Sequence, residues 1–100
     1  MPLRVIFRPA ARREYDEAYR HFESLRAGLG EEFADLADEM GVRLSQAPRL
    51  YAEVEAGVRL AILKRFSYGL IYAIEINEIV ILSVFHLRRD LNAWLDDYLN

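Results

Sequence analysis

The segment VRLAILKRFSYGLIYAIEINEIVILSVF, residues 58–85, decides the fold, because most of its apolar residues alternate with other residues or form β-branched runs. Alternation with a period of two is typical of strands whose faces meet different environments. The sequence predicts strands over 58–65 and 68–75, separated by a short turn. The third run, 79–85, is apolar at almost every position, so we expect it to lie inside a sheet with both faces covered.

Two helical patterns precede this segment. Apolar residues recur three and four positions apart from residue 9 to about residue 27, and the same period returns from about residue 31 to residue 46. Gly28 and Gly30 interrupt the pattern, and glycine is favoured where a helix ends in a left-handed turn. The sequence therefore predicts a helical hairpin. Its aromatic residues are expected to lie in the core: Tyr15, Tyr19, Phe22 and Phe33.

The ends of the chain add two shorter elements. Residues 3–7 predict a strand stopped by Pro9, and Asp90 can cap a short helix whose apolar stripe includes Trp94. That stripe packs either on the sheet or against a partner. The whole chain is thus expected to be one α+β domain over residues 1–100. A helical hairpin covers a four-stranded, mostly antiparallel sheet in the order β-α-α-β-β-β, followed by a short C-terminal helix.

The composition favours one globular domain without a metal, a cofactor or a membrane span. Hydrophobic residues make up 53% of the 100 residues, which suits one globular core. There are no cysteines and only two histidines, so we expect no metal and no cofactor. No apolar run reaches the roughly 18 residues needed to cross a bilayer, and we expect a cytoplasmic protein without a membrane partner.

Charge is unevenly distributed along the chain. Residues 9–56 carry six basic and eleven acidic groups, a net charge of −5, whereas residues 57–89 carry five basic and two acidic groups, a net charge of +3. Twelve of the thirteen cations are arginine, which suits planar contacts with carboxylates or phosphates. The total of −3 argues against a general nucleic-acid binder.

An ordered set of short motifs runs through nearly the whole chain. The set comprises Pro9-Ala10, Leu29-Gly30 before Phe33, Pro48, Gly57-x-Arg59, Arg65-Phe66-x-Tyr68-x-x-x-Tyr72, and His86-x-Arg88-Arg89-Asp90 with Trp94 beyond. In this order and spacing, the chain resembles toxins of the RelE/ParE superfamily of bacterial type II toxin-antitoxin systems. The resemblance implies a cognate antitoxin as partner. It also implies one of two targets: DNA gyrase in the ParE-like branch, or messenger RNA on the ribosome in the RelE-like branch.

The chemistry of the candidate residues bears on the branch. An RNA-cleaving site needs an acid, a base and cations around the phosphate, and His86, Arg65 and Arg88 would supply them, with Glu53 or Glu55 as a base. The acidic net charge and the single lysine fit such a nuclease poorly. We therefore expect a ParE-like toxin, not an enzyme; a RelE-like nuclease and a non-toxic binding module are the alternatives.

Each candidate binding residue also has a structural interpretation. His86 ends a buried strand and can be a structural histidine, Arg59 and Arg65 can pair with helical carboxylates, and Tyr68 and Tyr72 can be cross-strand packing. Arg88 and Arg89 can form a solvated corner. The residues expected to contact the target or the antitoxin are Arg59, Arg65, His86, Arg88, Arg89 and Trp94.

Overall fold

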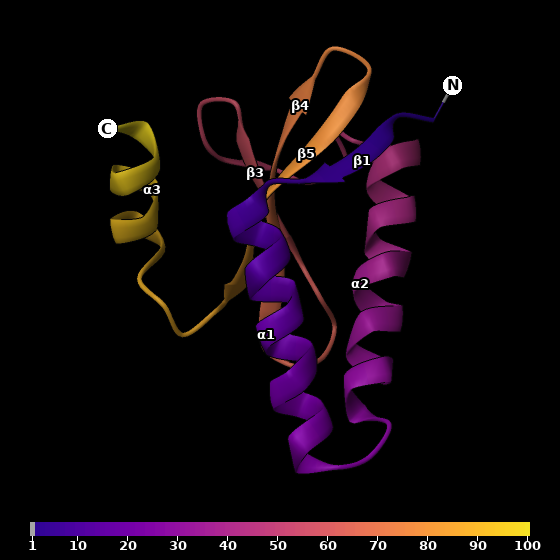
Figure 1. Cartoon of the computed structure of the whole chain (residues 1–100). Helices are drawn as coiled ribbons and strands as arrows, with labels where there is room; N and C mark the ends of the chain where they lie inside the picture. Colours follow the sequence, from indigo (N-terminus) through magenta and orange to yellow (C-terminus); the bar gives the residue numbers. More distant parts are fainter. Residues whose placement is uncertain (1) are drawn as a thin grey trace.

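The computed structural model describes residues 2–100, which form three layers: a helical hairpin, a sheet and a separate C-terminal helix (Figure 1). The elements are β1 (Arg4–Phe7), α1 (Pro9–Leu25), α2 (Leu29–Gln46), β2 (Glu53–Glu55), β3 (Val58–Ile62), β4 (Tyr68–Glu75), β5 (Glu78–His86) and α3 (Leu91–Leu99). The predicted α+β class and the order of the main elements are confirmed.

The sheet has five strands where the sequence predicts four. Its order is β1-β5-β4-β3-β2; β1 runs parallel to β5, and the other neighbours are antiparallel. The additional strand, β2, contains only Glu53, Val54 and Glu55, all exposed at the sheet edge. Three residues, two of them glutamate, show no alternation that would predict a strand with one buried face. This strand is therefore recognised only from its pairing with β3.

Both faces of β5 are covered, and an irregularity in this strand changes which side chains point to each face. Ile71 lies opposite Ser83 while the next residue, Tyr72, lies opposite Ile81, so Leu82 is an extra residue in the ladder. The side chains change parity at this bulge. Ile79, Ile81 and Val84 join the core beneath the hairpin, whereas Val80, Leu82 and Phe85 join the core on the opposite face. The expectation that both faces of this strand are covered is confirmed.

The first helix of the hairpin ends earlier than the periodicity predicts. Helix α1 stops at Leu25, which is 63% exposed because the tip of the hairpin extends beyond the sheet (Figure 1). Gly28 adopts a φ of +90°, which permits the sharp turn into α2. The carboxylate of Glu23 then accepts the N–H groups of Gly28 and Gly30 at 3.0 Å each. A side chain of α1 thus caps the start of α2.

Of the four aromatic residues expected in the core, two are buried in it, and the other two, Tyr19 and Phe22, are half-buried and pack against it. Phe33 and Tyr15 are buried, and Phe22 is half-buried with its ring 5.3 Å from Phe33 and 4.7 Å from Phe66. Beyond these rings, the predicted strand 58–65 ends at Ile62. Arg65 therefore lies in the loop between β3 and β4 and not on a strand face.

Tyr15 makes the stability of the hairpin sensitive to alkaline pH. Burial, and then the neighbouring Asp38 carboxylate, raise the pKa of Tyr15 from the ordinary 10.0 to about 12. The neutral phenol is favoured in the fold, so its contribution is complete below pH 10 and is lost as pH rises through about 12. We expect the melting temperature to fall over this range, and Tyr15→Phe to make the fall shallower. An equal slope in both proteins would contradict the assignment.

Candidate functional site

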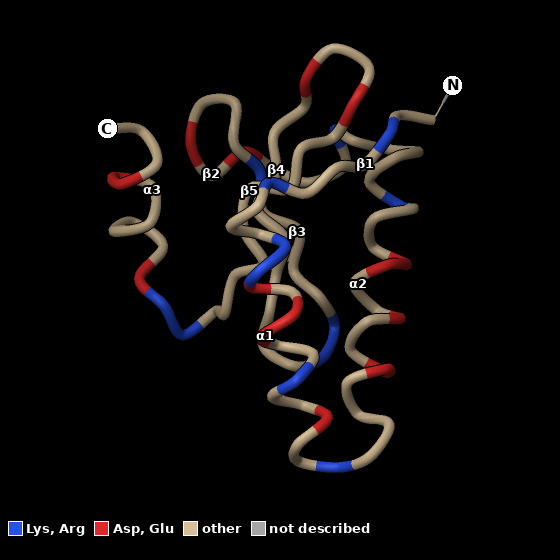
Figure 2. Tube along the Cα trace, in the orientation of Figure 1, with Lys and Arg blue, Asp and Glu red and all other residues tan. Residues whose placement is uncertain are grey.

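The basic corner, residues 86–90, leads from the end of β5 to α3 (Figure 2) and carries two of the candidate arginines, Arg88 and Arg89. The N–H of Leu87 donates to the C=O of Ser67 at 2.8 Å, and the N–H of Arg89 donates to the C=O of His86 at 3.0 Å. These bonds attach the start of the corner to the β3–β4 loop and turn the chain toward α3. The side chains of Arg88 and Arg89 consequently have different surroundings.

Arg89 has partners within the fold, although half of its side chain is exposed. Its guanidinium donates to Glu14 Oε2 at 3.0 Å and lies over the ring of Phe85, 5.0 Å from the centroid. The other oxygen of Glu14 accepts from the Ser83 hydroxyl at 2.9 Å and the Val84 N–H at 3.1 Å. The carboxylate of Glu14 therefore joins α1 to β5 and to the corner. Arg89 completes this cluster and is not a free surface charge.

Glu14 is expected to contribute measurably to stability. Its replacement by alanine leaves the fully buried Ser83 hydroxyl and the Val84 N–H without their acceptor. An unsatisfied buried group costs about 1–3 kcal/mol, so Glu14→Ala should lower the free energy of unfolding by that amount in urea titrations. Glu17→Ala, an exposed change one turn away on α1, should stay within about 0.5 kcal/mol. Equal midpoints for both variants would contradict this role.

Arg88 is exposed, and its side chain makes no ion pair or hydrogen bond with the residues that the structure describes. It borders the aromatic hollow, a surface depression of about 480 Å³. The hollow is lined by His21, Phe22, Phe66, Ser67, Tyr68, His86 and Arg88. One free guanidinium thus lies at a depression that also contains two imidazoles and three aromatic rings.

The β3–β4 loop forms one wall of the aromatic hollow in a strained conformation. Phe66 and Ser67 have φ values of +74° and +54°, and a bulky residue seldom adopts such values. The ring of Phe66 packs against Phe22, and the C=O of Ser67 accepts the N–H of Leu87. These packing and hydrogen-bonding contacts hold the loop in its strained conformation. Strained backbone of this kind is frequent at binding and catalytic sites.

His86 has a defined hydrogen bond. Its Nδ1 accepts the N–H of Arg88 at 3.0 Å, which leaves Nε2 available as a donor, and its ring lies 4.9 Å from Tyr68, edge to face. The side chain is half-buried. This geometry suits a histidine that orders the corner, and it still leaves one ring nitrogen for a ligand.

Arg65 and Arg59 lie away from the corner and have other partners. Arg65 donates to Glu32 at 3.1 Å and lies over the Phe66 ring. Hydrogen bonds from Arg26 and Arg65 lower the pKa of Glu32 below its usual value. Arg59 is only 15% exposed in its side chain, donates to the C=O of Tyr51 and lies 3.6 Å from Glu53.

The group of arginines that the nuclease interpretation requires is therefore not assembled around His86. Arg65 pairs with a carboxylate of α2, as the structural interpretation predicts, whereas Arg59 pairs with the edge strand β2 and not with a helix. Of the candidate arginines, Arg88 shares the aromatic hollow with His86, and Arg89 lines the adjoining depression with His86 but is paired with Glu14. Glu53 and Glu55 lie on β2, with Glu53 committed to Arg59.

Sequence reasoning missed two residues of this region, Glu14 and His21. Both lie on α1, seven residues apart and hence on one face of the helix, and they border adjoining depressions next to His86. In the sequence, only the seven-residue spacing connects these two residues. This spacing indicates a shared site only once α1 is known to pack beside β5.

Trp94, also a candidate contact, lies half-buried on α3 and packs with the second core on the sheet. Its ring stacks on Tyr98 at 5.2 Å and meets Phe85 edge to face at 6.5 Å. Of the two alternatives, the structure shows the stripe of this helix packed on its own sheet.

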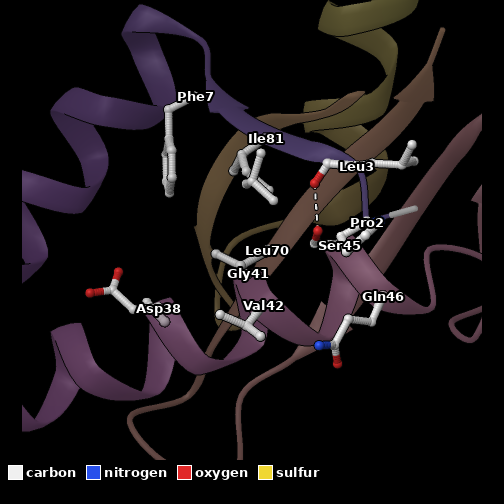
Figure 3. A pocket seen from close by; sticks show the side chains of 12 residues that line it. Pro2, Leu3, Phe7, Asp38, Gly41, Val42, Ser45, Gln46, Leu70 and Ile81 are labelled. Carbon is white, nitrogen blue, oxygen red and sulfur yellow. Dashed lines mark hydrogen bonds between the residues drawn. The ribbon is translucent and has the colours of Figure 1, made fainter. Parts of the chain in front are cut away.

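An apolar groove between β1 and α2 forms a second candidate site (Figure 3). Its volume is about 390 Å³, and the Ser45 hydroxyl donates to the C=O of Leu3 at one end, while Asp38 lies at the other. Gly41 leaves the middle of the groove open. The lining residues are Pro2, Leu3, Val5, Phe7, Ala37, Asp38, Gly41, Val42, Ser45, Gln46, Leu70 and Ile81.

Within residues 2–100, no cluster of three or more His, Asp or Glu side chains is placed to hold a metal ion. Over the same residues, no helix has both the length and the apolar character of a membrane span. Acidic residues recur along α2, opposite in sign to the arginines of the basic corner (Figure 2).

Known proteins resemble this chain both in sequence and in fold. Residues 5–91 match the family model described as the ParE toxin of the type II toxin-antitoxin system parDE. A chain from the chromosomal ParDE system of P. aeruginosa has the same fold with a TM-score of 0.74, at 20% identity, covering 85% of this chain and 96% of that one. A chain from the RelBE2 toxin-antitoxin complex of Mycobacterium tuberculosis gives 0.63 at 26% identity, covering 86% and 92%. No curated protein sequence gives a match.

Proposed function

Because the chain belongs to the ParE toxin family of type II toxin-antitoxin systems, we propose that it inhibits growth by acting on DNA gyrase and is neutralised by a cognate antitoxin. The family match over residues 5–91 carries this proposal, since it includes the basic corner, the aromatic hollow and all of the apolar groove except Pro2 and Leu3. Either target lies in the cytoplasm, where the protein would act.

The arrangement of charge supports a gyrase-directed toxin over a nuclease. A phosphodiester-cleaving site gains from several cations around the phosphate, and three of the four candidate arginines are paired with carboxylates, Arg89 with Glu14 beside His86. Arg88 remains free for contact with a protein target. An acidic chain also gains little attraction toward ribosomal RNA.

The apolar groove supports an antitoxin partner. Hydrophobic segments of a partner bind in such grooves by inserting a few apolar side chains, and a volume of about 390 Å³ accommodates that number. We place one antitoxin segment there, with its polar groups near Ser45 and Asp38.

Two assays with the purified protein test the target. The protein should inhibit gyrase supercoiling, leave ribosome-bound messenger RNA intact, and lose its effect when the neighbouring gene product is added. Cleavage of that RNA without an effect on gyrase would show that the proposal is wrong. Expression without the partner separates a toxin from the third alternative, because a non-toxic binding module should leave growth unchanged.

One observation favours the RelE-like alternative. His86 and Arg88 line the same hollow, and Nε2 of His86 is free for proton transfer. His86→Gln distinguishes the two functions, because glutamine keeps a hydrogen-bonding side chain but does not titrate near neutrality. A gyrase-directed toxin should retain its growth inhibition, whereas a nuclease that uses His86 should lose about 10²-fold or more in cleavage rate.

A further inference from the structure

The chain contains four serines and no threonine, and Ser67 differs from the other three serines in the state of its hydroxyl group. The hydroxyls of Ser24 and Ser45 each donate to a backbone carbonyl, and that of the fully buried Ser83 donates to Glu14. Ser67 is exposed in the β3–β4 loop, and its hydroxyl has no hydrogen-bond partner within residues 2–100. Ser67 is therefore the one serine of the described chain whose hydroxyl is free to react.

Two cations precede Ser67 along the chain. Lys64 lies three residues before it and Arg65 two residues before it, and both are exposed. Lys64 has no ion pair among the described residues, and Arg65 has only its exposed pair with Glu32. Basic residues at these two positions are a charge pattern by which protein kinases select a serine. None of the other three serines has a basic residue at both positions.

The loop that carries Ser67 can open to enter the extended substrate cleft of a kinase. One backbone hydrogen bond closes the loop, from the N–H of Leu63 to the C=O of Tyr68 at 2.9 Å. A second, from the N–H of Leu87 to the C=O of Ser67 at 2.8 Å, ties the loop to the basic corner. The positive φ values of Phe66 and Ser67 are strained, and opening of the loop relieves that strain.

The aromatic hollow brings Ser67 together with side chains that bind anions. Ser67 lines this hollow with Arg88, which has no partner among the described residues. Nε2 of His86 is a free donor in the same hollow, and His21 contributes a second imidazole from α1. No carboxylate lines the hollow. An anionic group on Ser67 would therefore meet hydrogen-bond donors and positive charge at close range.

Two carboxylates lie in the adjoining depression and oppose such an anion only weakly. Glu14 is paired with Arg89, which offsets its charge. Glu17 is exposed, so water and salt screen its charge. The hollow itself therefore keeps its positive character.

We propose that Ser67 is a phosphorylation site, that Arg88 and the two histidines of the hollow bind the phosphate, and that phosphorylation thereby inhibits the toxin. The inhibitory effect rests on the proposed function; the phosphate site does not. A phosphoserine carries a charge of about −1.5 to −2 at pH 7 and three strong acceptor oxygens, which suit a guanidinium. Arg88, the proposed contact with the target, is then bound within its own chain.

The phosphate donor is a nucleoside triphosphate held by a protein kinase. Oγ of Ser67 forms a bond to the γ-phosphorus, the bond from that phosphorus to the β,γ-bridging oxygen breaks, and the nucleoside diphosphate leaves. The proton of the Ser67 hydroxyl goes to a carboxylate of the kinase. Arg88 and the histidines take no part in the transfer and act only on its product.

The first test is phosphorylation of the folded, full-length chain. A kinase catalytic domain that requires basic residues two and three positions before serine should transfer radiolabelled phosphate from ATP to Ser67, as located by mass spectrometry. Ser67→Ala should remove the label, whereas Ser24→Ala, a change at another exposed serine, should not. A synthetic peptide of residues 62–69, ILKRFSYG, is the positive control for the enzyme. Labelling of the peptide but not of the folded chain, or labelling of a different serine, would overturn the site.

The second test is whether the hollow binds the phosphate, which phosphorus NMR measures in a chain with phosphoserine encoded at position 67. The chemical shift follows the second ionisation of the phosphate, whose pKa is ordinarily about 6. We expect a midpoint at least about 0.5 pH unit lower in the folded chain than in urea, because nearby positive charge favours the dianion. Arg88→Ala should remove most of this difference, and Arg13→Ala on the exposed side of α1 should not. Equal midpoints in the folded and unfolded chains would refute phosphate binding.

A gyrase supercoiling assay distinguishes failure of this inference from failure of the proposed function. The phosphorylated chain should require at least about a tenfold higher concentration than the unmodified chain for the same inhibition. Equal inhibition by both chains would overturn the regulatory effect and leave the proposed function intact. If neither chain inhibits gyrase, the proposed function and the inhibitory effect both fail, whereas the labelling and the NMR midpoint still decide the phosphate site.

Discussion

Arg88→Ala is expected to abolish growth inhibition while leaving the fold intact. The side chain is exposed, has no partner among the described residues and borders the aromatic hollow, so its removal deletes a contact without disturbing packing. The free energy of unfolding should change by less than about 0.5 kcal/mol. Growth curves after induction without the antitoxin, together with urea titrations of the purified variant, measure the two effects separately.

Arg89→Ala serves as the contrasting variant at the next position. Its guanidinium pairs with Glu14 and covers Phe85, so this change should reduce stability by up to about 1 kcal/mol, the range of a part-exposed ion pair, even where toxicity survives. Both arginines are exposed, as the sequence-based view of a solvated corner predicts, but Arg89 is paired with Glu14 whereas Arg88 has no partner among the described residues. Arg13→Ala on the exposed side of α1 controls for the loss of one positive charge and should leave toxicity unchanged.

The outcome that contradicts the proposed role is specific. If Arg88→Ala remained toxic while His86→Gln did not, the hollow would act through proton transfer instead of binding. The RelE-like alternative would then be favoured.

Ile81→Ala is expected to have the largest effect on stability. The side chain is fully buried, it pairs in register with Phe7 of β1, and it lies in the core beneath the hairpin. Such a truncation removes about 2–5 kcal/mol through lost burial and the cavity left behind. Total stability of a domain this size is about 5–15 kcal/mol, so the urea midpoint should fall sharply.

The matched control is Ile76→Ala in the turn between β4 and β5. Ile76 is 91% exposed, and the same chemical change there should alter stability by less than about 0.5 kcal/mol. Phe22→Ala should have an intermediate effect, because the ring is half-buried and not enclosed as the sequence pattern suggests. Equal urea midpoints for the Ile81 and Ile76 variants would refute the assignment of Ile81 to the core.

The elements with strong periodicity could be predicted from the sequence. In β4, alternation with a period of two places Tyr68, Leu70, Tyr72 and Ile74 on one side, and all four pack in or against the core beneath the hairpin. The helical hairpin follows for the same reason, since a stripe of apolar side chains needs only the local helix geometry to form. Burial of β5 on both faces is likewise visible in its composition.

Elements without periodicity could not be predicted in this way. Strand β2 has two exposed carboxylates among its three residues and exists only because β3 supplies hydrogen-bonding partners. The bulge at Leu82 is likewise defined by the pairing of β4 with β5. It changes which side chains of β5 face the hairpin, and no residue type in the sequence marks its position.

The sequence by itself determined the α+β class, the hairpin, the three long strands and which short motifs occur, because periodicity and turn chemistry are properties of neighbouring residues. The tertiary structure alone decided which arginines are free. Arg65 meets Glu32, 33 residues away, and Arg89 meets Glu14, 75 residues away. Coulomb attraction depends on distance in space, and the fold sets that distance independently of separation along the chain. For this reason Arg88 and Arg89, adjacent in sequence and identical in chemistry, occupy different environments.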